Sequence, residues 1–348
     1  MVTAVMEGPK TQPADVQAGE IKSKKKHEGS IKTRRIVSNV IVYIILILMS
    51  IIWLIPVVWL VLQSFGTETP SLAAQSRWWP QNWGFENYYF IATNKVKTAN
   101  GQILTSAFNF FWSTDSGKFV LGGFMYTLII AAITAILSTL FCLATSYAFS
   151  RLRFKARKPM MRIILILGMF PGFLGLIILY NFFKMIYADG HGVTIFYQSI
   201  WGLILIYSGG AGMGYYISKG FFDTISKQID EAAMVDGATR FQIFYKITLP
   251  LSKPIVVYTV LTSFMGPWAE YITSSYILGS AQNNQSGTTT TVANILYVMV
   301  NATEKDLPSR YWGQFCAGAV IVAIPTSLLF IALQKNYVSG VTGGAVKG

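Results

Sequence analysis

The chain has 348 residues, of which 53% are hydrophobic and 12% are charged, and its mean hydropathy is +0.46. An average soluble protein is about one quarter charged, so this composition excludes a set of soluble domains. The net charge of +13 is typical of nucleic-acid-binding proteins, but those proteins are not this apolar, and we expect no nucleic-acid partner. Cys142 and Cys316 lie in apolar runs without metal-ligand or disulfide spacing, which indicates buried, inert thiols.

Six apolar runs are long enough to cross a bilayer as helices, because a hydrocarbon core of about 30 Å needs about 20 helical residues. The runs cover residues 36–62, 119–149, 163–183, 195–217, 254–278 and 312–333. Pro171 interrupts the third run, where we expect a kink, and the fifth run contains one charge, Glu270. The sequence therefore predicts an all-α, polytopic membrane protein with six transmembrane helices.

The basic residues predict how the spans are oriented. With the first 35 residues inside, 21 of the 28 Lys and Arg residues lie on the inner side, and the charge of the outer side sums to zero. The positive-inside rule then places both termini in the cytoplasm. The expected parts are a cytoplasmic basic tail (1–35), a first span (36–62), an extracytoplasmic loop (63–118), a core of five spans (119–335) with a cytoplasmic loop at 218–253, and a cytoplasmic tail (336–348).

Two polar segments leave alternatives open. The basic tail is either a disordered topology anchor drawn to anionic lipid or a specific lipid or partner site. The long outer loop contains several aromatic residues that are either interfacial anchors or a docking site for an external protein or ligand. These aromatic residues are Trp78, Trp79, Trp83, Tyr88 and Tyr89.

The inner loop at 218–253 predicts two short helices joined by a tight corner. Four small or apolar residues share one helical face: Ile225, Ile229, Ala232 and Ala233. Asp230, Glu231 and Asp236 keep the rest of that helix polar. Gly237 is placed where a helix ends in the left-handed conformation.

The second helix of this loop has its own start and stop signals. Thr239 and Gln242 are spaced as a capping box, and Pro250 is expected to end the helix. From these features alone, the loop is either a knob that fits a cleft of a soluble partner or an amphipathic hairpin on the lipid headgroups.

The same loop resembles a known family. Glu231-Ala232-Ala233, Gly237, Ile247 and Leu249-Pro250 fit, at their spacing, the whole EAA signature of ABC-importer permease subunits. Glu86-Asn87-Tyr88, Trp312-Gly313 and the Gly-rich end at 340–348 are similar to segments of maltose-type G-class sugar permeases. The resemblance covers the chain from about residue 36 and implies the type I permease fold of ABC importers.

The resemblance implies a division of labour among several chains. This chain and a second permease subunit would enclose the pathway in a bacterial-type inner membrane, with two ATPase subunits beneath and an extracytoplasmic solute-binding protein above. ATP and Mg would be bound by the ATPase subunits, and this chain would bind no cofactor. The residues implied to dock with the ATPase are Glu231, Ala232, Ala233, Asp236, Gly237, Ala238, Arg240, Leu249 and Pro250.

Residues for the pathway itself are inferred from polarity within the spans. The candidates are Asn181, Tyr207, Ser208, Trp268, Glu270 and Tyr271. A charge at membrane depth indicates function, but Glu270 could equally make a helix–helix hydrogen bond or lie at the interface. The run at 209–214 is rich in glycine but lacks the Lys-Ser/Thr of a phosphate-binding loop, so it either packs closely or flexes in a gate. We expect no catalytic or metal site.

The solute is expected to be an oligosaccharide such as maltose or maltodextrin, on the strength of the family-like segments. Two alternatives remain: an importer of the same type for polyamine, phosphate or glycerol phosphate, and a membrane scaffold or sensor that recruits a cytoplasmic protein without transport. The Gly-rich tail either frays or reaches between the ATPase subunits.

Overall fold

A computed structural model shows the fold of the chain. It describes residues 14–67, 77–93, 110–115, 118–169, 172–188, 199–209, 212–278, 290–301 and 311–345. The chain divides into two units, Met1–Trp59 and Leu60–Gly348. Each unit is described by itself.

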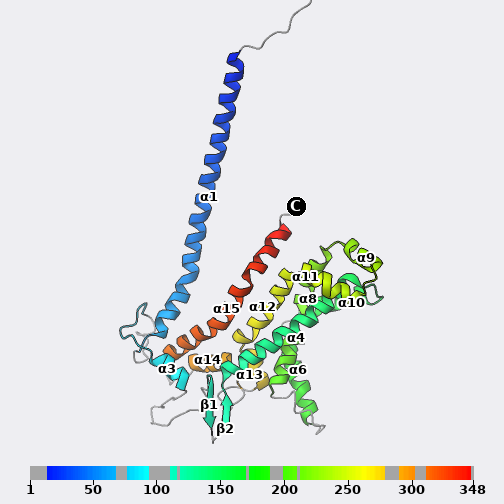
Figure 1. The fold of residues 1–348 in the computed structure, drawn as a ribbon. Coiled ribbons are helices and arrows are strands. Elements are labelled where there is room, and N and C mark those ends of the chain that lie inside the picture. Colours follow the sequence, from blue (N-terminus) through cyan, green and yellow to red (C-terminus); the bar gives the residue numbers. More distant parts are fainter. Residues whose placement is uncertain are drawn as a thin grey trace, which may run out of the picture. The chain divides into compact units, whose positions relative to one another are not determined.

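The first unit consists of one long helix, α1 (Ala14–Ser64), whose last residues belong to the second unit (Figure 1). The apolar side chains from Ile36 to Val58 are exposed along its whole circumference, as expected for a helix surrounded by lipid. The helix also includes residues 14–35 of the basic tail. The alternative in which the tail is a disordered topology anchor therefore does not hold for these residues.

The second unit begins with a small substructure in the predicted outer loop, where the rings of Phe65, Phe85 and Tyr88 pack together. It contains α3 (Glu86–Thr93), an isolated bridge between Gly66 and Trp83, and a hairpin of β1 (Trp112–Asp115) and β2 (Lys118–Leu121). The hairpin is antiparallel and pairs Trp112 with Leu121. The all-α prediction missed this hairpin, and the second span begins four residues later than predicted because 118–121 is a strand.

The helix α4 (Gly123–Arg151) is the central element of the second unit and packs against α7, α8, α12 and α14 (Figure 1). The elements that follow it are α5 (Arg157–Gly168), α6 (Gly172–Ala188), α7 (Ile200–Gly209) and α8 (Gly212–Asp223). The third predicted span is thus divided between α5 and α6, and Pro171 lies outside the described residues.

The inner-loop sequence forms α9 (Lys227–Val235), α10 (Arg240–Ile243), the π-helix η1 (Phe244–Thr248) and α11 (Leu249–Leu251). The fifth predicted span then forms two helices, α12 (Lys253–Ala269) and α13 (Ile272–Leu278). Its break is at Glu270, which has an extended backbone. Pro267, inside the last turn of α12, cannot donate a helical hydrogen bond and weakens the helix just before this break.

The last helices are α14 (Val292–Asn301) and α15 (Trp312–Ala345), so α15 continues through most of the expected tail. Together with α3, α4 and α12 they surround an apolar core that includes Ile91, Phe110, Trp268 and Met299. Within the described residues, 36–64, α4 and 312–336 are each long and apolar enough to cross a membrane. Two further pairs of helices are bent at a short break, and if each pair counts as one span, the described residues contain five spans.

Candidate functional site

The corner between α9 and α10 is a Schellman turn centred on Gly237. Its φ of +83° is left-handed, as the sequence predicted. The amide of Ala238 donates to the carbonyl of Ala233 at 2.9 Å, and the amide of Gly237 donates to the carbonyl of Met234 at 3.1 Å. These bonds satisfy carbonyl groups at the end of α9 that would otherwise lack partners. The corner is therefore a defined backbone structure.

The predicted capping box starts the second helix directly after the corner. The amide of Gln242 donates to Thr239 Oγ1 at 3.3 Å, and the amide of Thr239 donates to Gln242 Oε1 at 2.7 Å. The helical segment ends at Leu251, one residue beyond Pro250, so the predicted stop before the fifth span is present. Pro250 is the penultimate residue of this segment, and the chain bends by 84° between Leu251 and the start of α12 at Lys253.

The outer surface of the corner is apolar and exposed. Val235 is 88% exposed and Phe241 is 74% exposed, and Tyr245 is also exposed. Large apolar side chains at such an exposed position indicate a surface that binds either a protein or a membrane. Of the residues that the resemblance implicates, five are exposed (Glu231, Ala232, Asp236, Gly237 and Arg240), as is Pro250, whereas Ala233 is buried and Ala238 and Leu249 are half-buried.

The buried face of α9 differs from the predicted one. Ile229 and Ala232 are exposed, whereas Asp230 is buried together with Ala233. Asp230 Oδ2 forms an ion pair with Arg151 Nε at 2.9 Å, and this pairing makes burial of the carboxylate possible. The prediction that Asp230 belongs to the polar, solvated face was therefore wrong.

Further polar contacts connect the end of α4 to the segment before α9. Arg151 Nη2 donates to the carbonyl of Ile225 at 2.9 Å, and the Ser150 hydroxyl donates to Asp223 Oδ1 at 2.6 Å. The Tyr147 hydroxyl donates to the carbonyl of Arg240 at 3.3 Å. A displacement of the corner would therefore strain its contacts with α4.

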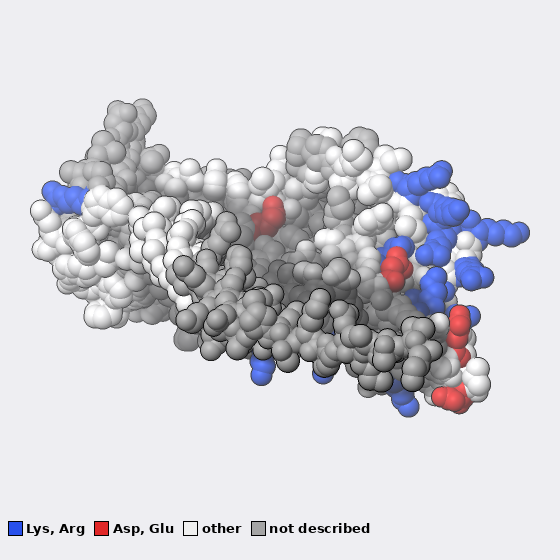
Figure 2. Space-filling model, turned by 90° about the horizontal axis from the view of Figure 1, so that it is seen from above, with Lys and Arg blue, Asp and Glu red and all other residues white. Residues whose placement is uncertain are grey.

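Basic side chains gather around this end of the second unit. Figure 2 shows Lys and Arg concentrated at the end where α9 and α10 lie. A cavity of about 260 Å³ between the corner and α4 is lined by both basic and acidic residues. Its charged residues are Arg151, Arg153, Arg157, Lys227, Asp230, Glu231 and Arg240. This is the charge pattern that the positive-inside rule assigns to a cytoplasmic end.

The structure brings two of the predicted pathway residues into contact. The Tyr207 hydroxyl on α7 donates to Glu270 Oε2 at 2.9 Å. The same carboxylate accepts from the amide of Thr273, so Glu270 also caps the start of α13. The break after α12 thus places a carboxylate between two helices and supplies it with donors.

The other predicted pathway residues lie apart from this pair or contact different groups. Asn181 is exposed on α6 and donates to the carbonyl of Ile177 in its own helix. Trp268 packs against Phe124 in the apolar core, and Tyr271 stacks on Tyr297 with ring centroids 3.7 Å apart. Ser208 is buried at the end of α7.

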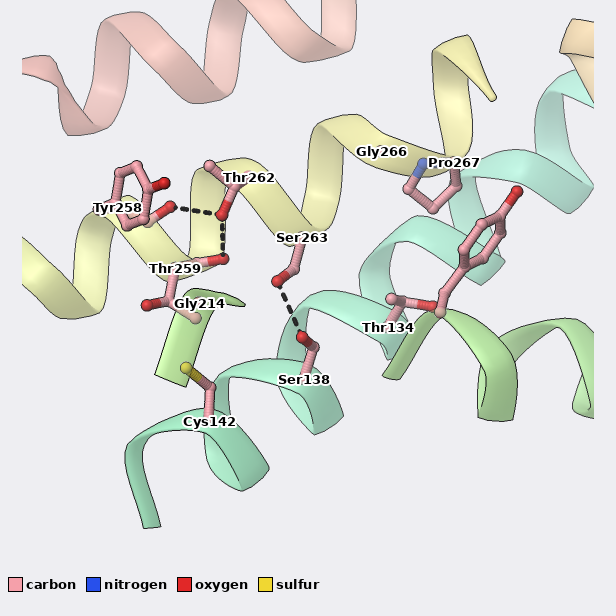
Figure 3. A pocket seen from close by; sticks show the side chains of 11 residues that line it. Thr134, Ser138, Cys142, Gly214, Tyr258, Thr259, Thr262, Ser263, Gly266 and Pro267 are labelled. Carbon is pink, nitrogen blue, oxygen red and sulfur yellow. Dashed lines mark hydrogen bonds between the residues drawn. The ribbon is translucent and has the colours of Figure 1, made fainter. Parts of the chain in front are cut away.

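A second cavity, which we call the hydroxyl cavity, lies between α4, α7, α8 and α12 and has a volume of about 280 Å³ (Figure 3). It is lined by Thr134, Ser138, Cys142, Tyr207, Gly214, Tyr258, Thr259, Thr262, Ser263, Gly266 and Pro267. Only Tyr207 was among the predicted pathway residues. The Ser and Thr positions were missed because single small hydroxyls are common in membrane helices. The sequence signal that could have predicted this cavity is the clustering of Thr259, Thr262 and Ser263 in one short stretch of the chain.

Comparisons with known proteins agree with these features. Residues 141–342 match the family described as binding-protein-dependent transport system inner membrane component. The chain is 32% identical over 321 residues to the galactooligosaccharides transport system permease protein GanQ of Bacillus subtilis strain 168, covering 92% of this chain and 99% of GanQ. It is 39% identical over 226 residues to the maltodextrin transport system permease protein MalD of Streptococcus pneumoniae strain R6, covering 65% of this chain and 74% of MalD.

A solved structure has a similar fold. It is a chain in the crystal structure of a bacterial ABC transporter involved in the import of the acidic polysaccharide alginate. The TM-score is 0.61 at 18% sequence identity, with 86% of this chain and 96% of that chain covered. The predicted permease fold is thus confirmed.

Proposed function

Because the chain belongs to the family of binding-protein-dependent transport system inner membrane components, we propose that it is the permease subunit of an ATP-driven carbohydrate importer. It is a transport subunit and not an enzyme. The relatives named for galactooligosaccharide and maltodextrin transport support an oligosaccharide as its solute. We propose a neutral oligosaccharide of the maltodextrin kind.

The observation that supports coupling to an ATPase is the exposed apolar corner at Gly237. Val235 and Phe241 protrude from a backbone that the Schellman turn and capping box define, while the Arg151–Asp230 pair connects it to α4. Such a corner fits a cleft of a soluble subunit better than it fits lipid headgroups, because anionic headgroups would repel the exposed carboxylates of Glu231 and Asp236 beside its apolar tip. Glu231, Asp236 and Arg240 would orient the contact.

The remaining parts of the assembly follow from this docking. The corner and the basic end of the second unit would face the cytoplasm, with both termini on that side. Two ATPase subunits would bind ATP and Mg, and a second permease subunit would complete the pathway. A solute-binding protein would deliver the oligosaccharide on the opposite side. ATP-driven closure of the ATPase subunits would shift the corner and, through its contacts with α4, the pathway helices.

The identity of the solute can be tested by deleting the gene for this chain and measuring the uptake of radiolabelled maltotriose. We expect uptake to be lost and then restored by the chain supplied from a plasmid. Unchanged maltotriose uptake together with lost uptake of spermidine, phosphate or glycerol phosphate would contradict a carbohydrate solute.

Co-purification tests the coupling. A tagged chain should retain a second permease and an ATPase whose hydrolysis rises when binding protein and sugar are added. An isolated chain, or one that binds a cytoplasmic protein without ATPase activity, would instead indicate a scaffold.

A further inference from the structure

Positive charge is concentrated where the chain turns from α4 into α5. Six basic residues and no acidic residue occur between positions 151 and 162: Arg151, Arg153, Lys155, Arg157, Lys158 and Arg162. Four of them are exposed and form no ion pair with any residue that the structure describes, namely Arg153, Lys155, Lys158 and Arg162. A cluster of four to eight basic residues beside a membrane-spanning helix is typical of a surface that binds anionic lipid.

The start of α5 adds to this positive charge. Its N-cap, Ala156, makes no side-chain hydrogen bond to the helix, and no acidic residue lies in the first turn. Arg157 and Lys158 occupy that turn instead, although the N-terminus of a helix favours negative charge. An anionic group at this position would therefore be stabilised by the helix dipole and by both side chains.

The same turn forms one wall of the cavity of about 260 Å³ between α4 and the corner, which we call the basic cavity. Five of its charged lining residues are basic and two are acidic, and one of these acids, Asp230, is already paired with Arg151. The cavity thus has an excess of positive charge. Its volume is several times the roughly 30 Å³ that one molecule of liquid water occupies, so it has room for a phosphate group and some water.

Three arginines line the basic cavity from the side of α4 and α5. Arg153 is exposed and Arg157 is half-buried, and both can reach a molecule in the cavity. Arg151 lies behind them with its side chain 3% exposed, and its Nη1 has no hydrogen-bond partner among the described residues. A guanidinium group fits a phosphate with two parallel hydrogen bonds, so Arg153 and Arg157 provide the donors and Arg151 adds charge from behind.

The part of α5 that follows the basic residues is apolar and exposed. Ile163, Ile166 and Leu167 are 55%, 56% and 63% exposed, as expected for side chains that contact acyl chains. Ile163 lies about 9 Å beyond Arg157 along the helix. When these apolar side chains are in the hydrocarbon layer, the basic cavity is therefore at the depth of the headgroup phosphates.

We propose that the basic cavity binds the phosphate group of an anionic phospholipid from the cytoplasmic leaflet, with Arg153 and Arg157 as the main donors. The acyl chains would lie along the apolar side chains of α5. A zwitterionic lipid fits less well, because its choline group would add a further cation to a basic site. This assignment rests on the proposed function, since it requires the corner to face the cytoplasm.

The test measures lipid binding to the complete transporter, purified in detergent and freed of lipid. Radiolabelled phosphatidylglycerol, or phosphatidylcholine with the same acyl chains, is titrated onto the bead-bound complex, and bound lipid is measured at equilibrium by scintillation proximity. We expect phosphatidylglycerol to bind at lower concentration than phosphatidylcholine. The double variant Arg153→Gln, Arg157→Gln should raise the half-saturating phosphatidylglycerol concentration about thirtyfold, as expected for two basic residues lost beside an anionic headgroup.

A matched double variant separates a built site from general attraction of charge. Lys246→Gln, Lys253→Gln removes the same charge from two exposed lysines that do not line the basic cavity, and phosphatidylglycerol binding should not change. Equal weakening by both double variants, or equal binding of phosphatidylcholine, would overturn the proposal. Inorganic phosphate at the same concentration should not displace the lipid, and full displacement would show instead a site for a soluble anion.

Maltotriose uptake by cells that carry the parent chain separates this proposal from the proposed function. Intact uptake without a preference for phosphatidylglycerol would reject the lipid site but not the importer. Absence of carbohydrate uptake, with a phosphatidylglycerol preference that Arg153→Gln, Arg157→Gln removes, would reject the importer but not the lipid site.

Discussion

Arg151 and Asp230 form a buried ion pair that joins the end of α4 to the first helix of the exposed corner. Nε and Oδ2 are 2.9 Å apart, and the two side chains are only 3% and 11% exposed. The pair is therefore removed from solvent and from screening by salt. It gives the corner a fixed charge contact with the central helix of the second unit.

Loss of one partner of this pair should destabilise the protein. Asp230→Asn leaves the Arg151 charge buried without a counter-charge, which costs about 3–5 kcal/mol in comparable pairs. We expect a lower melting temperature in detergent and loss of ATP-driven uptake. The combined variant Arg151→Met, Asp230→Leu buries no charge and should be more stable than either single variant. A double variant whose destabilisation equals the sum of the single effects would contradict coupling between these residues.

The effect of a substitution at Gly237 should depend on how easily the new residue adopts a left-handed backbone conformation, and not on the size of its side chain. Nothing lies within 4 Å of a Cβ built at this position, but its φ of +83° costs most L-residues about 1–2 kcal/mol. Gly237→Val should abolish uptake while membrane insertion persists. Gly237→Asn should retain more uptake, because Asn adopts this conformation readily.

Gly237→Asp is the informative charged variant. It matches Asn in shape but adds a negative charge beside Asp236, so we expect it to abolish ATP-driven uptake without affecting insertion. Uptake in membrane vesicles, with immunoblots of membrane fractions as control, measures both properties. Equal uptake by Gly237→Val and Gly237→Asn would show that the left-handed turn is not needed.

The exposed ring of Phe241 should contribute to docking of the ATPase. Phe241→Ala removes an aromatic side chain that packs against little within this chain, so the stability of the chain should change by less than about 0.5 kcal/mol. The amount of ATPase that co-purifies should fall at least about tenfold if Phe241 is a hot spot of that interface. Tyr89→Ala, at an equally exposed aromatic of α3, is the control and should retain the ATPase. Equal retention by both variants would exclude Phe241 from the interface.

Features of the corner that depend on neighbouring residues were predictable from sequence. The left-handed Gly237 and the Thr239–Gln242 capping box are local signals, and the structure has both. The helix end expected at Pro250 is also a local signal, and the structure places it one residue later, at Leu251.

Features that depend on distant residues were not predictable. Asp230 looks like an ordinary polar helix residue until α4 brings Arg151 against it. The hydroxyl cavity likewise requires Thr134 of α4 and Thr262 of α12 to face a common space, and neither helix shows this alone. Helix–helix packing, which membrane sequences encode only weakly through small residues, determines both sites.

Gly313 lies directly against the side chain of Asn87, which provides a test of the packing between α15 and α3. A Cβ on Gly313 would be 2.5 Å from Asn87 Nδ2 and 2.8 Å from its Cγ and Oδ1. The Asn87 amide is buried and donates to the carbonyls of Ser64 at 3.0 Å and Gly66 at 2.7 Å. An alanine at 313 would therefore push the amide away from both acceptors.

We expect Gly313→Ala to destabilise the protein by about 1–3 kcal/mol, the cost of leaving a buried polar group unpaired. Thermal unfolding in detergent measures this effect, and Gly220→Ala, where a Cβ would contact nothing within 4 Å, is the matched control. Asn87→Ala should be destabilising by a similar amount, since both carbonyls lose their donor. In the Asn87→Ala background the methyl group of Gly313→Ala has no amide to displace, so the second substitution should cost little more. Fully additive melting shifts would show that the two residues do not act through this contact.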